Sequence, residues 1–545
     1  MLRPTLCDLA NVPSLNLPVT HLKGFARYLV ASMLLQRTIG GTMTSTSAEA
    51  APGLVGRASW RLHPLFALLL LALVIRLAVA VWPNVVYPDE TFQYLEPAWR
   101  MLGHDGILTW EWRDGIRGWF LPTLMAGPVA LGDALAPGGA GAFLVPRLIA
   151  ACASLSIVVG AWFLGARISR THAVVAAFAT ATWFELFMLA PHTLGEPLAT
   201  ALIVPAALLL TDRPSQRRLA IGGGLLALAF VCRFQYAPAI AVLALGACWT
   251  RWRNLMPLVA GGLVALLLAA AIDLAHGAVP FAWLIANIRE NLVHDRAVEF
   301  GVSPPWAYLI DFLTVWSVAI LLPLAAIWRG WRHAPLLLAV ALVNLVFHSL
   351  IVHKEYRFVF LSVVLFTIVA ALGSADWVQW LRAKAAWRRW ALPIVLGGWA
   401  LLSVALAGAS DGMREYWTRG VGAAQLAAEL RSDPQMCGLA LYNVRFQQLP
   451  GRERLVGPVP LYSLQPADPL AELILPPLLL RATRPAFNRI LARPEAAGDL
   501  PADFSRQSCA RVGFSDACIY ARGGTCDTSA AAPFVINDVL VRMGQ

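Results

Sequence analysis

A series of long apolar runs, separated by short polar connections, dominates this sequence. A run of about 18 apolar residues is long enough to cross the hydrocarbon core of a bilayer. Only 14% of the 545 residues are charged, against about 25% in soluble domains, so the chain lacks the polar surface of a soluble protein. We therefore predict a mainly α, polytopic membrane helical bundle of about 11 spans. The predicted spans are residues 65–82, 143–166, 173–190, 194–211, 219–232, 236–249, 255–275, 306–328, 334–352, 357–375 and 390–408.

The basic residues between these runs are distributed asymmetrically. If the N-terminus is cytoplasmic, every Arg-rich cluster falls in a cytoplasmic connection, as the positive-inside rule requires. Counting the apolar stretch 119–135 as a span breaks this agreement. Pro122 and Pro128 also interrupt that stretch, so we interpret it as re-entrant or interfacial. The net charge of +11 follows from the same topology, and we expect no nucleic-acid partner. The clusters are Arg57/Arg61, Arg167/Arg170, Arg213/Arg217/Arg218, Arg251/Arg253, Arg329/Arg332 and Arg382/Lys384/Arg388/Arg389.

The pattern divides the chain into three regions. Residues 1–60 lack clear periodicity, and we predict a disordered or spurious extension, with Met43 as an alternative start. Residues 61–409 form the predicted membrane domain, in which 83–142 is the first outer loop. Residues 410–545 mix polar and apolar side chains with many prolines, which predicts a small α/β domain outside the membrane. A cleaved signal peptide is the competing interpretation of the first apolar run.

Four of the eight cysteines lie in the predicted C-terminal domain, namely Cys437, Cys509, Cys518 and Cys526. An even number of cysteines in one segment outside the membrane indicates disulfides and an oxidising compartment. Four cysteines allow three pairings, and the sequence does not choose among them. Four unpaired thiols are the alternative. The eleven-span topology also places this domain on the outer, non-cytoplasmic side, so the two arguments agree.

Polar side chains gather in the first outer loop, directly after the first predicted span. The segment reads Tyr87-Pro88-Asp89-Glu90-Thr91-Phe92-Gln93-Tyr94-Leu95-Glu96-Pro97. A carboxylate at a membrane surface, partly shielded from water, can act as a general base, which makes Asp89 and Glu90 candidate catalytic residues. Glu96 falls on the helix that is expected to follow. The alternative interpretation is a polar flank that ends the first span.

Aromatic and charged side chains follow in the same loop, as Trp110-Glu111-Trp112-Arg113 and then Arg117. Trp at the edge of a membrane commonly anchors a helix at the interface. The second interpretation is that Trp110 and Trp112 form an apolar wall for a sugar ring or a lipid chain.

A second polar segment, His353-Lys354-Glu355-Tyr356-Arg357-Phe358, separates two predicted spans. Charged side chains in this position are costly unless they have a function. Lys354 and Arg357 are three residues apart, on one side of a helical turn, where they can bind a phosphate group. Arg233, a lone charge between two apolar runs, is a further candidate for phosphate contact. His192 and Glu196 lie on an outer turn without reliable ligand spacing, so no metal and no other cofactor is predicted.

The two outer motifs together resemble those of a known family. The pattern Pro88-Asp89-Glu90-x-x-Gln93-x-x-Glu96, with Thr109-Trp110-Glu111-Trp112 and Arg117, is similar to the first luminal loop of the Alg9-like mannosyltransferases, glycosyltransferase family 22. His353-Lys354-Glu355-x-Arg357-Phe358 is similar to a later element of that family, and residues 273–277 and 300–308 resemble its second luminal loop. The resemblance covers about residues 64–375. It implies a GT-C fold, a dolichyl-phosphate-mannose-like donor and inversion at the anomeric carbon.

Roles for individual residues follow from this resemblance and from the charges described above. Asp89 matches the catalytic carboxylate, with Glu90 beside it. The donor phosphate is expected at Lys354, Arg357, Arg233 and His353. The substrate pocket is expected at Gln93, Glu96, Trp110, Glu111, Trp112 and Arg117. The expected partners are a lipid-phosphate sugar donor and a glycan or glycolipid acceptor, and the sequence has no motif for binding a nucleotide-linked sugar.

The Ala- and Arg-rich, Lys-poor composition indicates a GC-rich bacterial genome. We therefore expect a multi-pass protein of the bacterial inner membrane whose active site faces the periplasm, or the lumen of the endoplasmic reticulum in a eukaryote. Two other functions fit parts of the pattern. One is a GT-C transferase that uses another lipid-linked sugar. The other is a transporter or flippase of lipid-linked sugars, against which the one-sided polar motifs and the lack of an inverted repeat argue.

Overall fold

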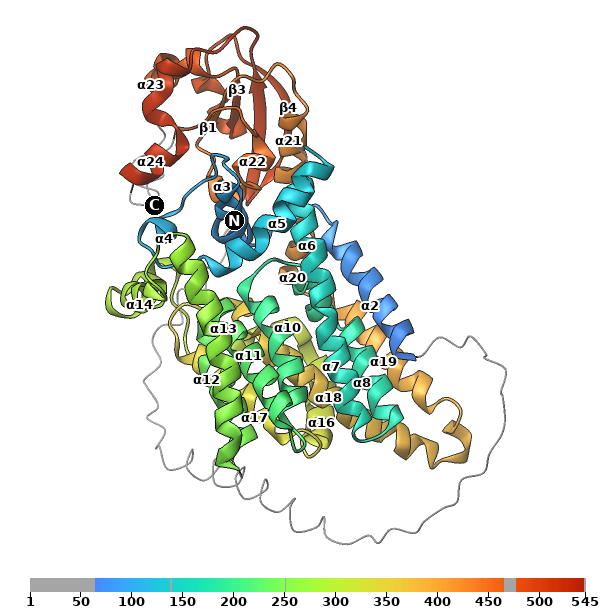
Figure 1. Cartoon of the computed structure of the whole chain (residues 1–545). Coiled ribbons are helices and arrows are strands. Elements are labelled where there is room, and N and C mark those ends of the chain that lie inside the picture. Colours follow the sequence, from blue (N-terminus) through green and yellow to red (C-terminus); the bar gives the residue numbers. More distant parts are fainter. Residues whose placement is uncertain (1–63, 138–139, 250, 465–476, 544–545) are drawn as a thin grey trace, which may run out of the picture. The chain divides into compact units, whose positions relative to one another are not determined.

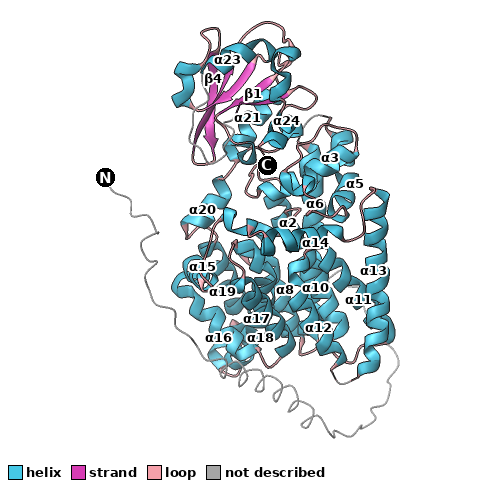
Figure 2. Cartoon of the chain, turned by 90° about the vertical axis from the view of Figure 1, so that its left-hand side faces the viewer, coloured by secondary structure: helices cyan, strands magenta, loops and turns pink. Residues whose placement is uncertain are grey.

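The computed structural model describes residues 64–137, 140–249, 251–464 and 477–543, so the predicted extension 1–60 lies outside the described residues. Every predicted span is helical, because backbone groups that face lipid must form hydrogen bonds within their own segment. Several spans contain a break between two shorter helices (Figures 1 and 2). The helices are α2 Pro64–Ala80, α6 Gly141–Ala153, α7 Leu155–Ala166, α8 Arg170–Thr182, α9 Phe184–Leu189, α10 Gly195–Leu210, α11 Gln216–Cys232, α12 Ala237–Cys248, α13 Leu255–Ala275, α15 Ala307–Trp316, α16 Leu321–Gly330, α17 Pro335–Leu350, α18 Phe360–Arg382 and α19 Ala391–Leu406.

The lengths of these helices support a membrane protein with several spans. Among the described residues, four continuous helical segments are long and apolar enough to cross a bilayer, namely Gly141–Ala166, Trp252–Ala275, Ala307–Gly330 and Tyr356–Arg382. The remaining apolar helices are shorter, so the number of 11 spans stays a prediction. The stretch 119–135 forms helix α5, Phe120–Leu135, and its re-entrant or interfacial character also stays a prediction.

The predicted cytoplasmic connections contact one another at one end of the bundle, away from the β-sheet (Figure 1). Arg167 Nη1 donates to Thr211 Oγ1 at 2.5 Å, and Arg382 Nη1 donates to Thr171 Oγ1 at 3.0 Å. Three of the connections that carry basic clusters, those around residues 167–171, 211–218 and 382–389, therefore lie together, as the charge pattern predicts. Which face is cytoplasmic remains a prediction.

The C-terminal part of the chain forms a mixed α/β domain, as predicted. Its five-stranded sheet has the order β2-β1-β3-β5-β4. Strand β1 is parallel to both β2 and β3, whereas β5 is antiparallel to its neighbours β3 and β4. The three parallel strands are buried along their whole length, and their sequences are mostly apolar, as is typical of strands covered on both faces. The boundary at residue 410 stays a prediction. The strands are β1 Leu439–Tyr442, β2 Leu461–Leu464, β3 Arg489–Ala492, β4 Ser505–Val512 and β5 Ser515–Ala521, and the helices are α20 Asp411–Thr418, α21 Val421–Arg431, α22 Arg452–Leu455, α23 Pro477–Thr483 and α24 Ile536–Arg542.

Two disulfides join the four cysteines of this domain. Cys509 and Cys518 are direct cross-strand partners in the β4–β5 hairpin. Cys437 and Cys526 connect the segment before β1 to the segment after β5. The predicted disulfide framework is confirmed, and one of its three possible pairings is now assigned.

Helix α18 is the core of the membrane bundle. Of its most apolar 18-residue window, 94% is buried by neighbouring helices. Its contact with α16 depends on two glycines, because a Cβ atom on Gly373 would lie 1.9 Å from the backbone oxygen of Ala326, and one on Gly330 would lie 2.0 Å from that of Val369. Small residues allow this close approach of two helices, as is common in membrane proteins.

We expect Gly373→Ala to destabilise the protein by about 3 kcal/mol, because the added methyl group meets a backbone atom and the helices must separate. The measurement is the thermal unfolding midpoint of the purified protein in detergent. Gly397→Ala on α19 is the matched control, since a Cβ atom there meets nothing within 4 Å. That variant is expected to be neutral or slightly stabilised by the better helix propensity of alanine. Equal midpoints for the two variants would contradict this account of the α16–α18 contact.

Candidate active site

Asp89 lies at the start of the first outer loop's helical segment. It precedes a single π-helical turn, Glu90–Leu95, which leads into α3, Glu96–Met101. The Asp89 side chain is 32% exposed, and its Oδ2 atom accepts a hydrogen bond from Arg357 Nη2 at 2.5 Å. The two outer motifs, 268 residues apart in the sequence, therefore meet at one ion pair.

Arg357 is surrounded by carboxylates. Its side chain is only 5% exposed, and its Nε atom donates to Glu355 Oε2 at 2.7 Å. The Oε1 atom of Glu196 lies 3.9 Å from the same nitrogen. The guanidinium also lies over the rings of Tyr87 and Phe358, each 5.3 Å from the ring centre. Three acidic groups and two aromatic faces thus neutralise and enclose one buried cation.

Arg233 joins the same cluster from the end of α11. Its Nη2 atom lies 3.3 Å from Glu196 Oε1, and its guanidinium lies 4.6 Å above the Phe358 ring. Glu196 is almost completely buried at the start of α10. The sequence analysis considered Glu196 only as a metal ligand, whereas the structure places it between two arginines. An acidic residue that opens an apolar helix was the signal available in the sequence.

Lys354 and His353 have other neighbours in this structure. Lys354 Nζ donates to the backbone oxygens of Ser303 at 3.0 Å and Ile351 at 2.5 Å, which connects this segment to the second outer loop. Burial lowers the pKa of Lys354. His353 Nε2 lies 3.3 Å from Glu355 Oε1. Of the four predicted phosphate contacts, Arg357 and Arg233 share Glu196, and His353 shares Glu355 with Arg357.

Glu90 points to a different set of partners from Asp89. Its carboxylate binds Arg147 of α6 through Nε at 2.9 Å and Nη2 at 2.5 Å, and His192 Nδ1 at 2.8 Å. The backbone N–H of Thr193 donates to it at 3.0 Å. Burial favours the neutral acid, but the charges of Arg147 and His192 and their hydrogen bonds outweigh it and lower the pKa of Glu90 well below its usual range. Glu90 is 1% exposed, so this geometry suits an ion pair that orients the turn.

The predicted pocket residues Gln93, Glu111 and Arg117 contact one another. Gln93 Nε2 donates to Glu111 Oε1 at 2.6 Å, and Arg117 Nη2 lies 3.8 Å from the same oxygen. Burial raises the pKa of Glu111, against the opposing charge of Arg117. Arg117 also lines a cavity of about 490 Å³ together with Arg233, Tyr94 and Trp283, and the volume includes its open mouth.

Trp110, Trp112 and Glu96 lie outside the walls of that cavity. Trp110 stacks on Phe300 at 6.2 Å and lies beneath the Arg296 guanidinium, so it joins the two outer loops. Trp112 packs against Trp119 at 4.8 Å. The aromatic wall is supplied instead by Trp283 of α14, Ala282–Ile288, which the sequence analysis did not single out.

Glu96 connects the first outer loop to the C-terminal domain. Its two oxygens accept the backbone N–H groups of Ile107 at 2.6 Å and Arg452 at 2.7 Å. Burial raises the pKa of Glu96 to about 7, and these hydrogen bonds oppose the shift. Phe92 packs edge-on against Phe446 at 5.1 Å beside this junction.

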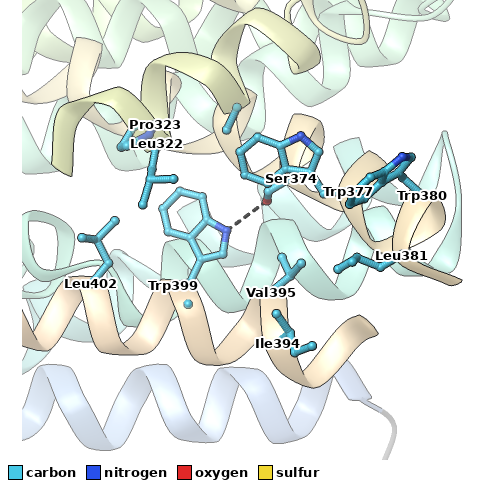
Figure 3. Close-up of a pocket in the computed structure, with 12 residues that line it drawn as sticks. Leu322, Pro323, Ser374, Trp377, Trp380, Leu381, Ile394, Val395, Trp399 and Leu402 are labelled. Atoms are coloured by element: carbon cyan, nitrogen blue, oxygen red, sulfur yellow. Dashed lines mark hydrogen bonds between the residues drawn. The ribbon is translucent and has the colours of Figure 1, made fainter. Parts of the chain in front are cut away.

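A larger cavity and a possible ligand cluster lie near the other end of α18. The cavity, about 950 Å³, is lined by the apolar side chains and tryptophans of α16, α18 and α19, and Trp399 Nε1 donates to Ser374 Oγ at 3.0 Å there (Figure 3). Ser374 follows Arg357 by 17 residues, roughly 26 Å along a helix, so this cavity is separate from the ionic cluster.

The ligand cluster consists of His172, His333 and Asp376, whose donor atoms lie within 4.8 Å of one another. In the described part of the chain, these are the His, Cys, Asp or Glu side chains that lie close enough together, in a set of three, to hold a metal ion. Asp376 Oδ2 also lies 3.2 Å from Arg329 Nε, so in this structure the cluster is an ion-pair network.

Comparisons with known proteins agree with this architecture. Residues 67–415 match the sequence profile of the Alg9-like mannosyltransferase family. The chain is 28% identical to GPI mannosyltransferase 3 of Yarrowia lipolytica over 61% of its own length and 66% of that protein. It is 24% identical to GPI alpha-1,2-mannosyltransferase 3 of Bos taurus over 50% of its length and 52% of that protein. It therefore spans between half and two thirds of the curated relatives it matches.

Solved structures share the fold. ArnT from Cupriavidus metallidurans bound to undecaprenyl phosphate superimposes with a TM-score of 0.56 at 13% identity, over 84% of this chain and 99% of that one. The apo form gives a TM-score of 0.55 at 15% identity, over 85% and 98% of the two chains. The predicted GT-C fold is confirmed, and the chain is a multi-pass membrane protein. Since the family profile matches 67–415 of 545 residues, this protein belongs to the Alg9-like mannosyltransferase family.

Proposed function

We propose that this protein is an inverting mannosyltransferase that moves mannose from a polyprenyl-phosphate-mannose donor to a hydroxyl group of a glycan or glycolipid. The ion pair between Asp89 and Arg357 carries the proposal, because it brings the two outer motifs to one place. A partly exposed carboxylate held by a buried guanidinium is well placed to be the general base for an acceptor hydroxyl. Family membership supports mannose as the sugar, and two of the relatives are GPI mannosyltransferases.

In the proposed reaction the acceptor hydroxyl oxygen attacks the anomeric carbon of mannose. Its proton passes to Asp89 Oδ1, the oxygen opposite the one bonded to Arg357. The bond between the anomeric carbon and the phosphate oxygen breaks, and polyprenyl phosphate leaves with the electron pair. A single displacement inverts the configuration, and it requires a base on one side of the sugar and cations on the other.

Two arginines that line the cavity keep one donor atom each for a ligand. The Nε atoms of Arg117 and Arg233 are buried without a hydrogen-bond partner in the described part of the chain, and both residues line the 490 Å³ cavity. Each of these two residues forms one looser ion pair, with Glu111 at 3.8 Å and with Glu196 at 3.3 Å, whereas Arg357 is hydrogen-bonded to both Asp89 and Glu355. We therefore propose that Arg117 and Arg233 contact the donor phosphate first. Lys354, Arg357 and His353 complete the phosphate site after Lys354 exchanges its backbone carbonyl partners for phosphate oxygens.

The lipid donor and the outer location have separate support. The ArnT structure of the same fold holds undecaprenyl phosphate, which is consistent with a polyprenyl phosphate donor here. Two disulfides in the C-terminal domain suit an oxidising compartment. We propose that the site faces this compartment, the bacterial periplasm or the lumen of the endoplasmic reticulum.

We expect Asp89→Asn to lower the transfer rate by a factor of roughly 100 or more, because the amide cannot accept the acceptor's proton. The assay is transfer in washed membranes, with polyprenyl-phosphate-mannose or nucleotide-linked mannose as donor. Asp114→Asn is the matched control, since Asp114 belongs to the same outer loop and forms an exposed pair with Arg296 at 2.8 Å. Normal activity of a well-folded Asp89→Asn protein would exclude Asp89 as the base. If the protein transfers other lipid-linked sugars but not mannose, the proposed sugar is wrong and the alternative transferase function holds.

We expect Arg233→Gln and Arg117→Gln each to raise the apparent KM for the lipid donor about 10-fold or more, with a smaller effect on the acceptor KM. The reason is the loss of a charge-assisted hydrogen bond to phosphate, about 1.5–3 kcal/mol. Steady-state kinetics with both substrates varied measure the effect. Arg253→Gln, which removes the same charge from a predicted cytoplasmic connection, should change neither constant. Unchanged donor constants in both cavity variants would remove these arginines from the phosphate site.

A further inference from the structure

A second cavity contains unpartnered polar atoms and lies on the other side of the turn that follows Asp89. It occupies about 380 Å³, including its open mouth, between the first outer loop, α5 and α6, and the segment of the C-terminal domain around α22. Thr91, Trp99 and Arg454 line it. In each of these residues one polar atom is buried without a partner among the described residues, namely Thr91 Oγ1, Trp99 Nε1 and Arg454 Nη1. Unpartnered buried polar atoms are uncommon, and three of them line this one cavity.

Arg454 is the most informative of the three. Its guanidinium lies 4.5 Å above the ring of Phe143, and no hydrogen bond or ion pair to it is found in the described part of the chain. Burial lowers the pKa of Arg454 to about 10, and the nearby charge of Arg147 adds to the shift, while Glu90 opposes it. The side chain is therefore still a cation at neutral pH. A partly buried cation without a counter-ion is costly unless a ligand supplies the negative charge.

None of the charged groups near Arg454 forms an ion pair with it in the described part of the chain. Arg147 lies on the same Phe143 ring at 4.2 Å, but Glu90 neutralises it. The carboxylate of Glu96 also lines the cavity, and its two oxygens are occupied by the backbone N–H groups of Ile107 and Arg452. Glu453 lines the cavity as well, and among the described residues it forms no ion pair with Arg454. The charge of Arg454 is therefore left for a ligand.

The three unpartnered atoms have a common chemistry. Trp99 Nε1 and Arg454 Nη1 are donors only, and the Thr91 hydroxyl can donate. Trp99 is 3% exposed and Thr91 is 2% exposed, so neither is a surface group whose partner is bulk water. A ligand that satisfies all three needs several acceptor oxygens and a negative charge, which is the chemistry of a phosphate group.

We propose that this cavity binds a phosphate-class oxyanion that is part of the acceptor. The proposal rests on the proposed transferase function. Thr91 follows Asp89 by two residues in the same segment, so an oxyanion held at Thr91 and Arg454 positions an acceptor beside the base. The C-terminal domain supplies Arg454 and thereby takes part in acceptor selection.

Direct binding of inorganic phosphate tests the site without any assay of transfer. The full chain in detergent is heated at constant ionic strength and pH 7, with chloride progressively replaced by phosphate. We expect phosphate to raise the melting temperature of the wild type by about 3 °C. Because the proposed donor site at Arg117 and Arg233 also binds phosphate, we expect Arg454→Gln and Trp99→Phe each to reduce this rise and to abolish it when combined with Arg233→Gln. Without phosphate, Arg454→Gln should melt at or above the wild-type temperature, because it removes an unpaired cation, whereas a structural arginine would lower it.

Three further variants assign the effect to this cavity. Arg506→Gln removes an exposed charge from β4 of the same domain and should keep the full rise. Lys354→Gln changes only the predicted donor site, so adding Arg454→Gln to it should reduce the rise further. Arg454→Lys, which restores the charge, should recover part of it. A rise that is undiminished in both Arg454→Gln and Trp99→Phe, or that is reduced equally in Arg506→Gln, would overturn the anion site.

The kinetic arm distinguishes an acceptor-borne phosphate from free phosphate. We expect Arg454→Gln to raise the KM of a phosphate-bearing acceptor about 10-fold or more, to leave the donor KM unchanged, and not to affect an acceptor that lacks the phosphate. Lost phosphate binding with an unchanged acceptor KM would overturn the acceptor assignment. A wild-type protein that shows the phosphate-dependent rise but no sugar transfer would instead overturn the proposed function, so the two failures are distinguishable.

Discussion

The buried guanidinium of Arg357 determines the geometry of the groups around it. A cation in this position is stable only when nearby acceptors neutralise it, and Asp89, Glu355 and Glu196 do so from three separate segments. Arg357 comes just before α18, a helix that packs against α8, α10, α16, α17 and α19. The proposed base is therefore held in place by the hydrophobic core, although Asp89 itself belongs to a loop.

Glu90, the carboxylate next to Asp89, holds the same turn in place through different partners. Glu90 is enclosed by Arg147 and His192, so the turn that begins at Asp89 is attached to α6 and to the segment before α10. Two consecutive acidic side chains thus bind two different arginines. Because Glu90 cannot rotate without leaving a buried charge unpaired, the direction of the Asp89 side chain is also restricted. A neutral residue at position 90 would leave Arg147 without its counter-ion.

Much of the fold follows from local patterns, whereas the site depends on packing. Apolar runs in lipid must be helices, and the mixture of polar and apolar side chains with many prolines in residues 410–545 predicts a small α/β domain. Asp89 and Arg357 were identified as candidates by their motifs. That Asp89 pairs with Arg357 and Glu90 with Arg147 was not readable, because neighbouring acidic residues are equivalent in sequence until the bundle separates them. Trp283 and Arg454 were missed, and Glu196 was considered only as a metal ligand, for a related reason: the role of an isolated residue depends on which side chains surround it in the fold.

The segment that begins at Asp89 lies between two cavities whose arginines keep unpartnered donor atoms. Tyr94, in its π-helical turn, lines the cavity that contains Arg117 and Arg233, and Thr91, in the same turn, lines the cavity that contains Arg454. An anion in each cavity would be held by its own arginines, with the turn between them. Such an arrangement keeps two like-charged phosphate groups apart while a neutral hydroxyl and an anomeric carbon approach each other. In this proposal the carboxylate at the start of the turn accepts the proton of that hydroxyl, while the turn itself contributes Tyr94 to one cavity wall and Thr91 to the other.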